Sequence, residues 1–182
     1  MAEVNAIRER ILDTASLLFQ RRGYELVGVN EIIKTSEVAK ATFYHHFTSK
    51  EQLCLEWLRL EKEKAEANSQ QILDSSEDAE VRIKKKYNQL ELHLLIHDYR
   101  GCPFSNTKVM VPESEEITDL IVSYKKSAQL FWEQIAIDAN MDEMMGSALF
   151  LLYSGATSEA QNISNLSPLN SAVLASCALL GV

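Results

Sequence analysis

Several features that define whole classes of protein are missing from this 182-residue sequence. It has no run of about 18 apolar residues, as a membrane span would need, and its first residues lack the apolar core and cleavage site of an export signal. Its three cysteines, Cys54, Cys102 and Cys177, show neither paired nor metal-finger spacing. We therefore expect a cytoplasmic protein with no membrane partner, no disulfide framework and reduced thiols.

Sequence patterns of common enzyme classes are also missing. The chain has no glycine-rich phosphate loop, no His-Glu-x-x-His pattern and no Gly-x-Ser-x-Gly elbow. Its many Asp and Glu residues fit solvated helix faces better than general-acid pairs. We predict neither catalysis nor a cofactor nor a bound metal.

An excess of positive charge is absent too, since the formal net charge is −8. The charge is uneven, because residues 1–50 hold seven Lys or Arg against six Asp or Glu, whereas the remainder holds eleven against twenty. This balance argues against indiscriminate binding of nucleic acid, and it places the acidic load after residue 50.

What the sequence does contain is a succession of helical patterns. Apolar residues recur at three- and four-residue steps from Ile7 to Phe19, with Asn5 as a candidate N-cap and Gly23 as a stop. Two short helices follow, separated by a break at Ser36-Glu37. Thr48 with Glu51, or Ser49 with Gln52, has the spacing of a capping box at the start of a long fourth helix.

The second half of the chain continues in the same way. A polar stretch from Asn68 to Asp78 predicts a bend, and the pattern from Ala79 to His97 predicts another helix. Further helices are expected from the acidic turn at 112–116 to about Asn140, from Asp142 to Asn162, and from Pro168 to Val182. The prediction is an all-α protein of about nine helices, without strands.

The first three helices and the start of the fourth resemble the TetR family of bacterial transcription regulators. The resemblance covers roughly residues 7–58 and depends above all on Thr42-Phe43-Tyr44-His45-His46-Phe47 followed by Ser49-Lys50-Glu51-Gln52-Leu53. It implies a helix-turn-helix DNA-binding domain over residues 1–50 and a ligand-sensing, dimerising domain over residues 51–182.

Residue roles follow from this resemblance and from the chemistry of the side chains. Early residues of a recognition helix reach base edges, so Lys40 and Thr42 are the candidates for base reading. Tyr44, His45 and His46 are expected to contact phosphates, as is Lys50 in the first turn of the next helix. Phe43 and Phe47, four residues apart, are expected to point into the core.

Four positions depart from the family pattern, namely Gly28, Ile33, Glu37 and Ala39. Glu37 stands where the turn often has glycine, and a left-handed conformation there would cost about 1 kcal/mol or more relative to glycine. Ala39 stands where Ser often caps the recognition helix, a loss of roughly 0.5–2 kcal/mol unless the Ser36 hydroxyl replaces that cap. These departures keep open a helical interaction protein that no longer binds DNA.

The resemblance further implies a homodimer on a palindromic double-stranded DNA operator, released by a small-molecule effector. Asp142–Asn162 and Pro168–Val182 are the candidate dimer helices, since their alanines and glycines permit close approach and their leucines supply apolar area; an intramolecular core is the alternative. An effector pocket between helices of the body has eight candidate lining residues: Tyr87, His93, Phe104, Tyr124, Phe131, Trp132, Phe150 and Tyr153.

Two further features of residues 51–182 suggest a reactive thiol and a metal site. If Pro103 begins a helix, the positive end of that helix would favour the thiolate of Cys102, and the Gly-Cys-Pro-Phe run resembles one in a branch of the family that includes sensors of reactive compounds. His93 and His97 are four residues apart, a spacing that can place two imidazoles on one metal ion. The alternatives are an inert cysteine and two ordinary helix histidines.

Overall fold

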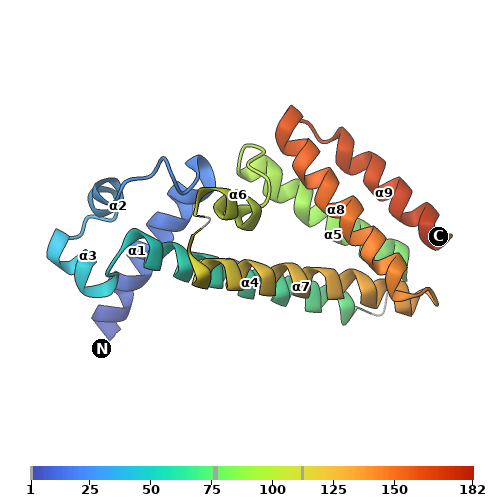
Figure 1. The fold of residues 1–182 in the computed structure, drawn as a ribbon, viewed down its shortest axis with the longest axis horizontal. Coiled ribbons are helices and arrows are strands. Elements are labelled where there is room, and N and C mark those ends of the chain that lie inside the picture. The colour runs from blue at the N-terminus through green and yellow to red at the C-terminus, as the bar shows by residue number, and fades with distance from the viewer. Residues whose placement is uncertain (1, 76–77, 112) are drawn as a thin grey trace. The chain divides into compact units, whose positions relative to one another are not determined.

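The computed structural model describes residues 2–75, 78–111 and 113–182, and over these residues it contains nine helices and no strand (Figure 1). This confirms the all-α prediction. The helices are α1 (Ala2–Arg22), α2 (Val29–Thr35), α3 (Lys40–His46), α4 (Lys50–Leu73), α5 (Ala79–Ile96), α6 (Pro103–Met110), α7 (Glu115–Asp138), α8 (Glu143–Ile163) and α9 (Ser167–Leu180). None of these helices is long and apolar enough to cross a membrane.

The contacts of the chain divide it into two compact units. The first unit comprises Met1–Lys62 and Pro103–Ile121, and the second comprises Glu63–Cys102 and Val122–Val182. α4 and α7 each contribute residues to both units, so the packing division falls within helices. The functional division between residues 1–50 and 51–182 is a statement about roles and stays a prediction.

The first unit is built on the apolar stripe of α1. Ile11, Ala15 and Phe19 are almost fully buried, at 0–2% exposed, as their helical spacing predicts. Gly23 ends α1 as expected: it takes a φ of 83°, which glycine adopts without strain, and its N–H donates to the Phe19 carbonyl at 2.8 Å. The start of α1 was predicted wrongly, because the helix begins at Ala2 and already runs through Asn5.

α4 is longer than its composition suggests, so the bend predicted from Asn68 to Asp78 begins only at Asp74 and its predicted start is wrong. The helix continues to Leu73, with Ile72 4% exposed in the core of the second unit. The hydroxyl of Ser69 donates to the Ala65 carbonyl at 2.8 Å, so this polar side chain is satisfied within the helix. Of the residues expected to form the bend, Ser76 and Glu77 lie outside the described residues.

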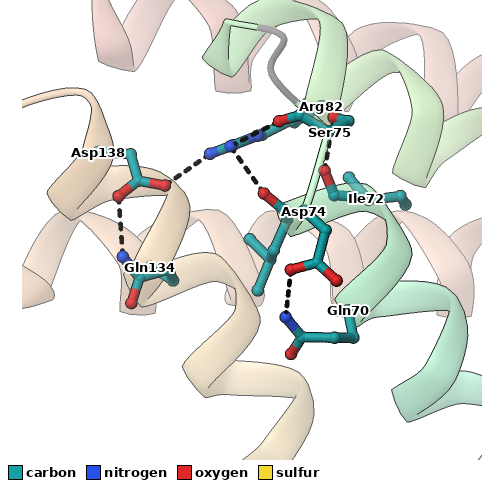
Figure 2. A network of polar contacts seen from close by, with 8 residues as sticks. Gln70, Ile72, Asp74, Ser75, Arg82, Gln134 and Asp138 are labelled. Carbon is teal, nitrogen blue, oxygen red and sulfur yellow. Dashed lines mark hydrogen bonds and ion pairs between the residues drawn. The ribbon is translucent and has the colours of Figure 1, made fainter.

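The end of α4 is held by a guanidinium from the next helix (Figure 2). Arg82 of α5 donates to the carbonyls of Leu73 and Ser75 at 2.8 and 2.9 Å, and it pairs with Asp138 at the end of α7 at 2.5 Å. Gln134 donates to the second carboxylate oxygen of Asp138 at 2.8 Å. One cation thereby satisfies a carbonyl in the last turn of α4, which has no partner within that helix, and a second carbonyl in the turn that follows.

The second unit has one core, to which α5, α7, α8 and α9 contribute. α8 and α9 run side by side and both contact α5. Gly146 of α8 is required by a close approach, because a Cβ there would lie 2.3 Å from the Glu133 Cα of α7. Asp78 and Asp142 cap α5 and α8 by accepting from Val81 N and Met145 N, both at 2.9 Å, which confirms the predicted cap at Asp142.

Candidate nucleic-acid interface

α3 carries polar and aromatic side chains outside the core, while Phe43 and Phe47 anchor the helix in it. Phe43 and Phe47 are both 0% exposed, which confirms their predicted inward orientation. Five candidate DNA-binding residues lie on this helix; three are exposed and two half-buried: Lys40, Thr42, Tyr44, His45 and His46. The Phe43 ring meets the Tyr44 ring edge-on at 5.3 Å, so the buried anchor also supports an exposed aromatic. The structure thus brings these five together on one short helix.

The turn between α2 and α3 keeps a left-handed residue although it lacks the glycine that the family often has there. Glu37 adopts φ 54°, the left-handed region, and Ala39 at the N-cap of α3 makes no side-chain capping hydrogen bond. Ser36 does not replace that cap, because its hydroxyl donates backwards to the carbonyl of Ile32 at 2.7 Å. The possible substitute cap is therefore wrong, and α3 begins without a side-chain acceptor.

Lys50 is the first residue of α4, and its ammonium lies against the turn that follows α1. Its Nζ lies 4.1 Å from the centre of the Tyr24 ring and donates to the Glu25 carbonyl at 3.4 Å. Partial burial lowers the pKa of Lys50, while the nearby Glu25 carboxylate acts in the opposite direction. The sequence identified Lys50 as a candidate, but its two neighbours were missed because they are about 25 residues away in the chain.

The N-terminus of α4 uses the second of the two predicted capping boxes. Ser49 Oγ accepts from the Gln52 amide at 3.0 Å, and Gln52 Oε1 accepts from the Thr48 amide at 2.7 Å. Gln52 thus fills the role proposed for it, with its side chain reaching one residue beyond the usual partner. No such pair joins Thr48 to Glu51 among the hydrogen bonds of the described residues.

A cluster of charged residues that sequence analysis missed joins α1 to α4. Arg8 pairs with Glu56 at 2.8 Å, and Glu56 also accepts from Arg59 at 2.7 Å. The Arg8 guanidinium lies 5.2 Å from the centre of the Phe47 ring, at the end of α3. Arg8 therefore contacts Phe47, the residue that caps the C-terminus of the candidate recognition helix. Arg8 and Glu56 are 48 residues apart in the chain, so no local sequence pattern predicts that they pair.

Four of the predicted ligand-binding residues form an aromatic cluster in the core of the second unit. Trp132 lies 5.8 Å from Tyr87, 5.3 Å from Tyr153 and 5.3 Å from Phe131, measured between ring centres. Burial raises the pKa of Tyr87 to about 12, and Tyr87 shares a hydrogen bond with Ser176 at 3.2 Å. Burial also raises the pKa of Tyr153. These contacts show packing, and their role in binding an effector stays a prediction.

The other predicted ligand-binding residues are distributed more widely. Phe104 is 2% exposed and belongs to the first compact unit, whereas Phe150 is half-buried against the core of the second. Tyr124 is half-buried on α7, and the neighbouring Lys125 ammonium lies 6.0 Å from its ring centre. That ammonium also lies 3.8 Å from the sulfur of Cys102, which is half-buried just before α6. Pro103 begins α6, as the proposed environment of Cys102 requires.

The two histidines proposed as a metal pair do lie together on α5. The His93 and His97 ring centres are 4.6 Å apart, and a ring nitrogen of His93 shares a hydrogen bond with the Gly101 carbonyl at 3.2 Å. Within the described part of the chain, no group of three or more His, Cys, Asp or Glu residues is placed to hold a metal ion. Two imidazoles alone do not complete a zinc site.

An apolar groove of about 720 Å³ runs along the exposed faces of α8 and α9. None of the predicted ligand-binding residues lines it. Its lining consists of small and apolar side chains with one carboxylate: Ala148, Leu151, Leu152, Gly155, Ala156, Glu159, Pro168, Ser171, Ala172, Ala175 and Leu179. Leu149 and Ala160, which were also predicted to pair helices, are 0% exposed and pack within the unit.

Comparisons with known proteins point to one family. Residues 11–56 match the sequence model for bacterial regulatory proteins of the TetR family. The chain is 39% identical over 89 residues to the HTH-type transcriptional regulator YxaF of Bacillus subtilis, covering 46% of this chain and 47% of that protein. It is 48% identical over 44 residues to the HTH-type transcriptional repressor NemR of Escherichia coli, covering 24% and 22% respectively.

The fold of the whole chain is similar to solved structures as well. A TetR-family transcriptional regulator from Streptomyces coelicolor superposes with a TM-score of 0.86 at 21% identity, covering 96% of this chain and 94% of the other. At this level of identity the likeness shows the fold alone. The sequence matches, in contrast, span less than half the length of the curated relatives named above.

Proposed function

Because the chain belongs to the TetR family of bacterial regulatory proteins, we propose that it is a sequence-specific DNA-binding transcription regulator. It acts as a homodimer that represses transcription from a palindromic operator and is released by a small-molecule effector. The family is one of regulators rather than enzymes, which agrees with the lack of catalytic motifs.

The observation that carries this proposal is the surface of α3. Its side chains include a cation, a hydroxyl, a phenol and two imidazoles, all suited to base edges or phosphates, while Phe43 fixes the helix from behind. Lys40 and Thr42 lie in the first turn, where base contacts are made in a helix-turn-helix. Tyr44, His45, His46 and Lys50 supply affinity and register.

The groove on α8 and α9 supports a second copy of the chain as the partner. Its apolar lining suits close helix packing, and two DNA-binding domains are needed to read half-sites about 34 Å apart. No Lys, Arg or His occurs after Lys126 in the sequence, so the pairing rests on shape and apolar area. The homodimer accordingly joins the exposed faces of α8 and α9.

We call the DNA-binding domain of each subunit, residues 1–50, its head. Effector control requires a ligand that prefers one of two separations of the two heads, because a ligand with equal affinity for both states does not change their populations. The aromatic cluster around Trp132 is the proposed site of this preference. α4 contributes to both compact units, and we propose it as the element that transmits the change. A cross-link across the dimer interface that freezes head spacing should abolish induction, and unaffected induction would remove this role.

The central proposal is tested by a gel shift with the DNA upstream of the chain's own gene. Specific binding should weaken steeply as salt rises, and Lys40→Ala or Thr42→Ala should relax base preference at their positions. Tyr44→Phe and His45→Ala should weaken binding to all sequences alike. Lys126→Gln, which removes one positive charge from the second unit, is the matched control. Absence of any specific shift would favour a helical interaction protein.

A thiol sensor of the same fold is a second candidate, favoured by the position of Lys125. Its ammonium lies 3.8 Å from the Cys102 sulfur, and a neighbouring cation is a feature of reactive cysteines. Under this proposal Cys102→Ser abolishes induction by electrophiles or oxidants and leaves operator binding intact. Cys177→Ser provides the control, since Cys177 is buried in the core. An unchanged dose response in Cys102→Ser would exclude the sensor.

A further inference from the structure

The ammonium of Lys50 is held in place by two groups that no assigned role explains. The face of the Tyr24 ring lies 4.1 Å away, and the Glu25 carbonyl accepts from Nζ at 3.4 Å. Both belong to the turn between α1 and α2, whereas Lys50 begins α4. A cation over an aromatic face is attracted by the quadrupole of the uncharged ring, whose negative pole lies over that face. Lys50 is therefore ordered before any partner arrives.

Tyr24 is itself fixed to the core of the first unit. Its ring lies 5.6 Å from that of Phe19, which in turn lies 5.3 Å from that of Trp57 on α4. Phe19 and Trp57 are each 2% exposed. The backbone turn at Gly23, whose N–H is bonded to the Phe19 carbonyl, sets where Tyr24 leaves α1. The ring face offered to Lys50 is thus held by a chain of packed aromatic rings.

A lysine side chain normally loses much rotamer freedom when it binds a phosphate, because its four-carbon stem is flexible. An ammonium also has three donors, and only one of them is directed at the Glu25 carbonyl. Prior ordering by Tyr24 lowers the entropy lost when a phosphate accepts a remaining donor. The same ring provides attraction without itself carrying a charge that repels DNA.

We propose that Tyr24 is a positioning residue for DNA binding, which acts by holding the Lys50 ammonium beside the N-terminus of α4, where the DNA backbone docks. This role rests on the proposed function. Tyr24 can fill this positioning role without touching the DNA. Operator affinity then depends on the aromatic ring of Tyr24 and not on its hydroxyl.

The alternative is that the Tyr24–Lys50 contact only stabilises the head. The two can be separated by double-mutant analysis of DNA binding with the full-length protein. The probe is a fluorescent duplex of about 30 base pairs of arbitrary fixed sequence, which reports the sequence-independent phosphate contacts, and its affinity is measured between about 50 and 200 mM salt. The variants are Tyr24→Phe, Tyr24→Leu, Lys50→Gln and Tyr24→Leu combined with Lys50→Gln.

Lys50→Gln should reduce the salt slope by about 0.9 per head, as expected for one lost phosphate contact. Tyr24→Leu should weaken binding roughly 2- to 5-fold per head, or about 5- to 30-fold in a dimer, the range of one exposed cation–π contact. Tyr24→Phe keeps the ring face and should stay within about twofold of wild type. In the Lys50→Gln background, Tyr24→Leu should have no further effect, because the two residues act as one unit.

Equal weakening by Tyr24→Leu in both backgrounds would overturn the positioning role, as would wild-type affinity in Tyr24→Leu. Tyr24→Met, which has a similar volume but a longer and more adaptable side chain beside Phe19, replaces Tyr24→Leu if helicity by circular dichroism shows that the latter is unfolded. Lys126→Gln controls for the loss of one charge. If the wild-type protein shows no salt-dependent binding either to this duplex or to the DNA upstream of its own gene, the proposed function fails and this role fails with it, an outcome distinct from a failure confined to Tyr24.

Discussion

Replacing Glu37 with glycine is expected to stabilise the first compact unit by roughly 0.5–1 kcal/mol. Glu37 holds φ 54° at the turn before α3, and a side chain in this conformation costs about 1–2 kcal/mol that glycine avoids. Glycine loses more freedom on folding, which returns about 0.4–1 kcal/mol. Glu37 is exposed and its side chain makes no hydrogen bond or ion pair among the described residues, so the substitution loses no contact.

The measurement is urea unfolding followed by the fluorescence of Trp57, in a Trp132→Phe background so that the signal comes from the first unit alone. The expected gain corresponds to a rise of roughly 1–4 °C in the melting temperature. Glu37→Ala is the matched control, because it removes the charge but keeps the Cβ and hence the strain. Glu37→Asn should fall between them, since asparagine tolerates the left-handed region.

Both Glu37→Gly and Glu37→Ala should also bind DNA more tightly, because each removes a negative charge from the turn that leads into α3. Only the glycine variant should be more stable. Equal stability of the glycine and alanine variants, or a lower stability of the glycine variant, would refute the argument that backbone strain at Glu37 is the quantity being released.

Three further predictions concern the second unit. Glu159→Gln should tighten the proposed dimer by roughly 5- to 30-fold in sedimentation equilibrium, since it removes a carboxylate that neither α8 nor α9 can pair with a cation; weaker association would contradict this. Gly146→Ala should destabilise the unit by about 1–3 kcal/mol in urea unfolding because its methyl would meet the Glu133 backbone, whereas Gly155→Ala, with nothing within 4 Å in its own subunit, should not destabilise the unit at concentrations where the protein is monomeric. Burial lowers the pKa of Lys86 to about 8, so unfolding takes up a proton between about pH 8 and 10.5 and the stability attributable to this group rises over that window; Lys86→Met should flatten the rise, and an unchanged pH profile would show that Lys86 does not cause it.

Much of the fold could be predicted because its signals are local. Gly23 and Asp142 act within one helical turn of the ends that they mark, and the four-residue spacing of Phe43 and Phe47 is enough to place both on one buried face. The cap expected from Ser36 failed for a local reason also, since a hydroxyl near a helix end can equally bond backwards to the preceding turn.

The features that could not be predicted depend on partners distant in the chain. The stretch from Asn68 is polar enough for a loop, and its helical state is supported by Arg82, whose guanidinium bonds to the carbonyls that follow. Likewise, the composition around Lys50 shows a cation at a helix start, but not that Tyr24 lies under it. The exposure of α3 could be predicted from the sequence. Which aromatic residues form an effector site depends on how the helices pack, and the spacing of residues along the chain does not show this.

The lack of basic residues after Lys126 has a consequence for a cell that contains several regulators of one fold. Subunits that recognise each other by opposite charges can be sorted from their paralogues by a few exchanged residues, but α8 and α9 carry only Glu143 and Glu159 as charged side chains. Fidelity of pairing then rests on the contour made by Gly155 and its small neighbours. Dimers of two different subunits would be disfavoured by poor shape complementarity rather than by charge repulsion. A substitution at a single small residue could therefore allow or prevent the formation of such mixed dimers.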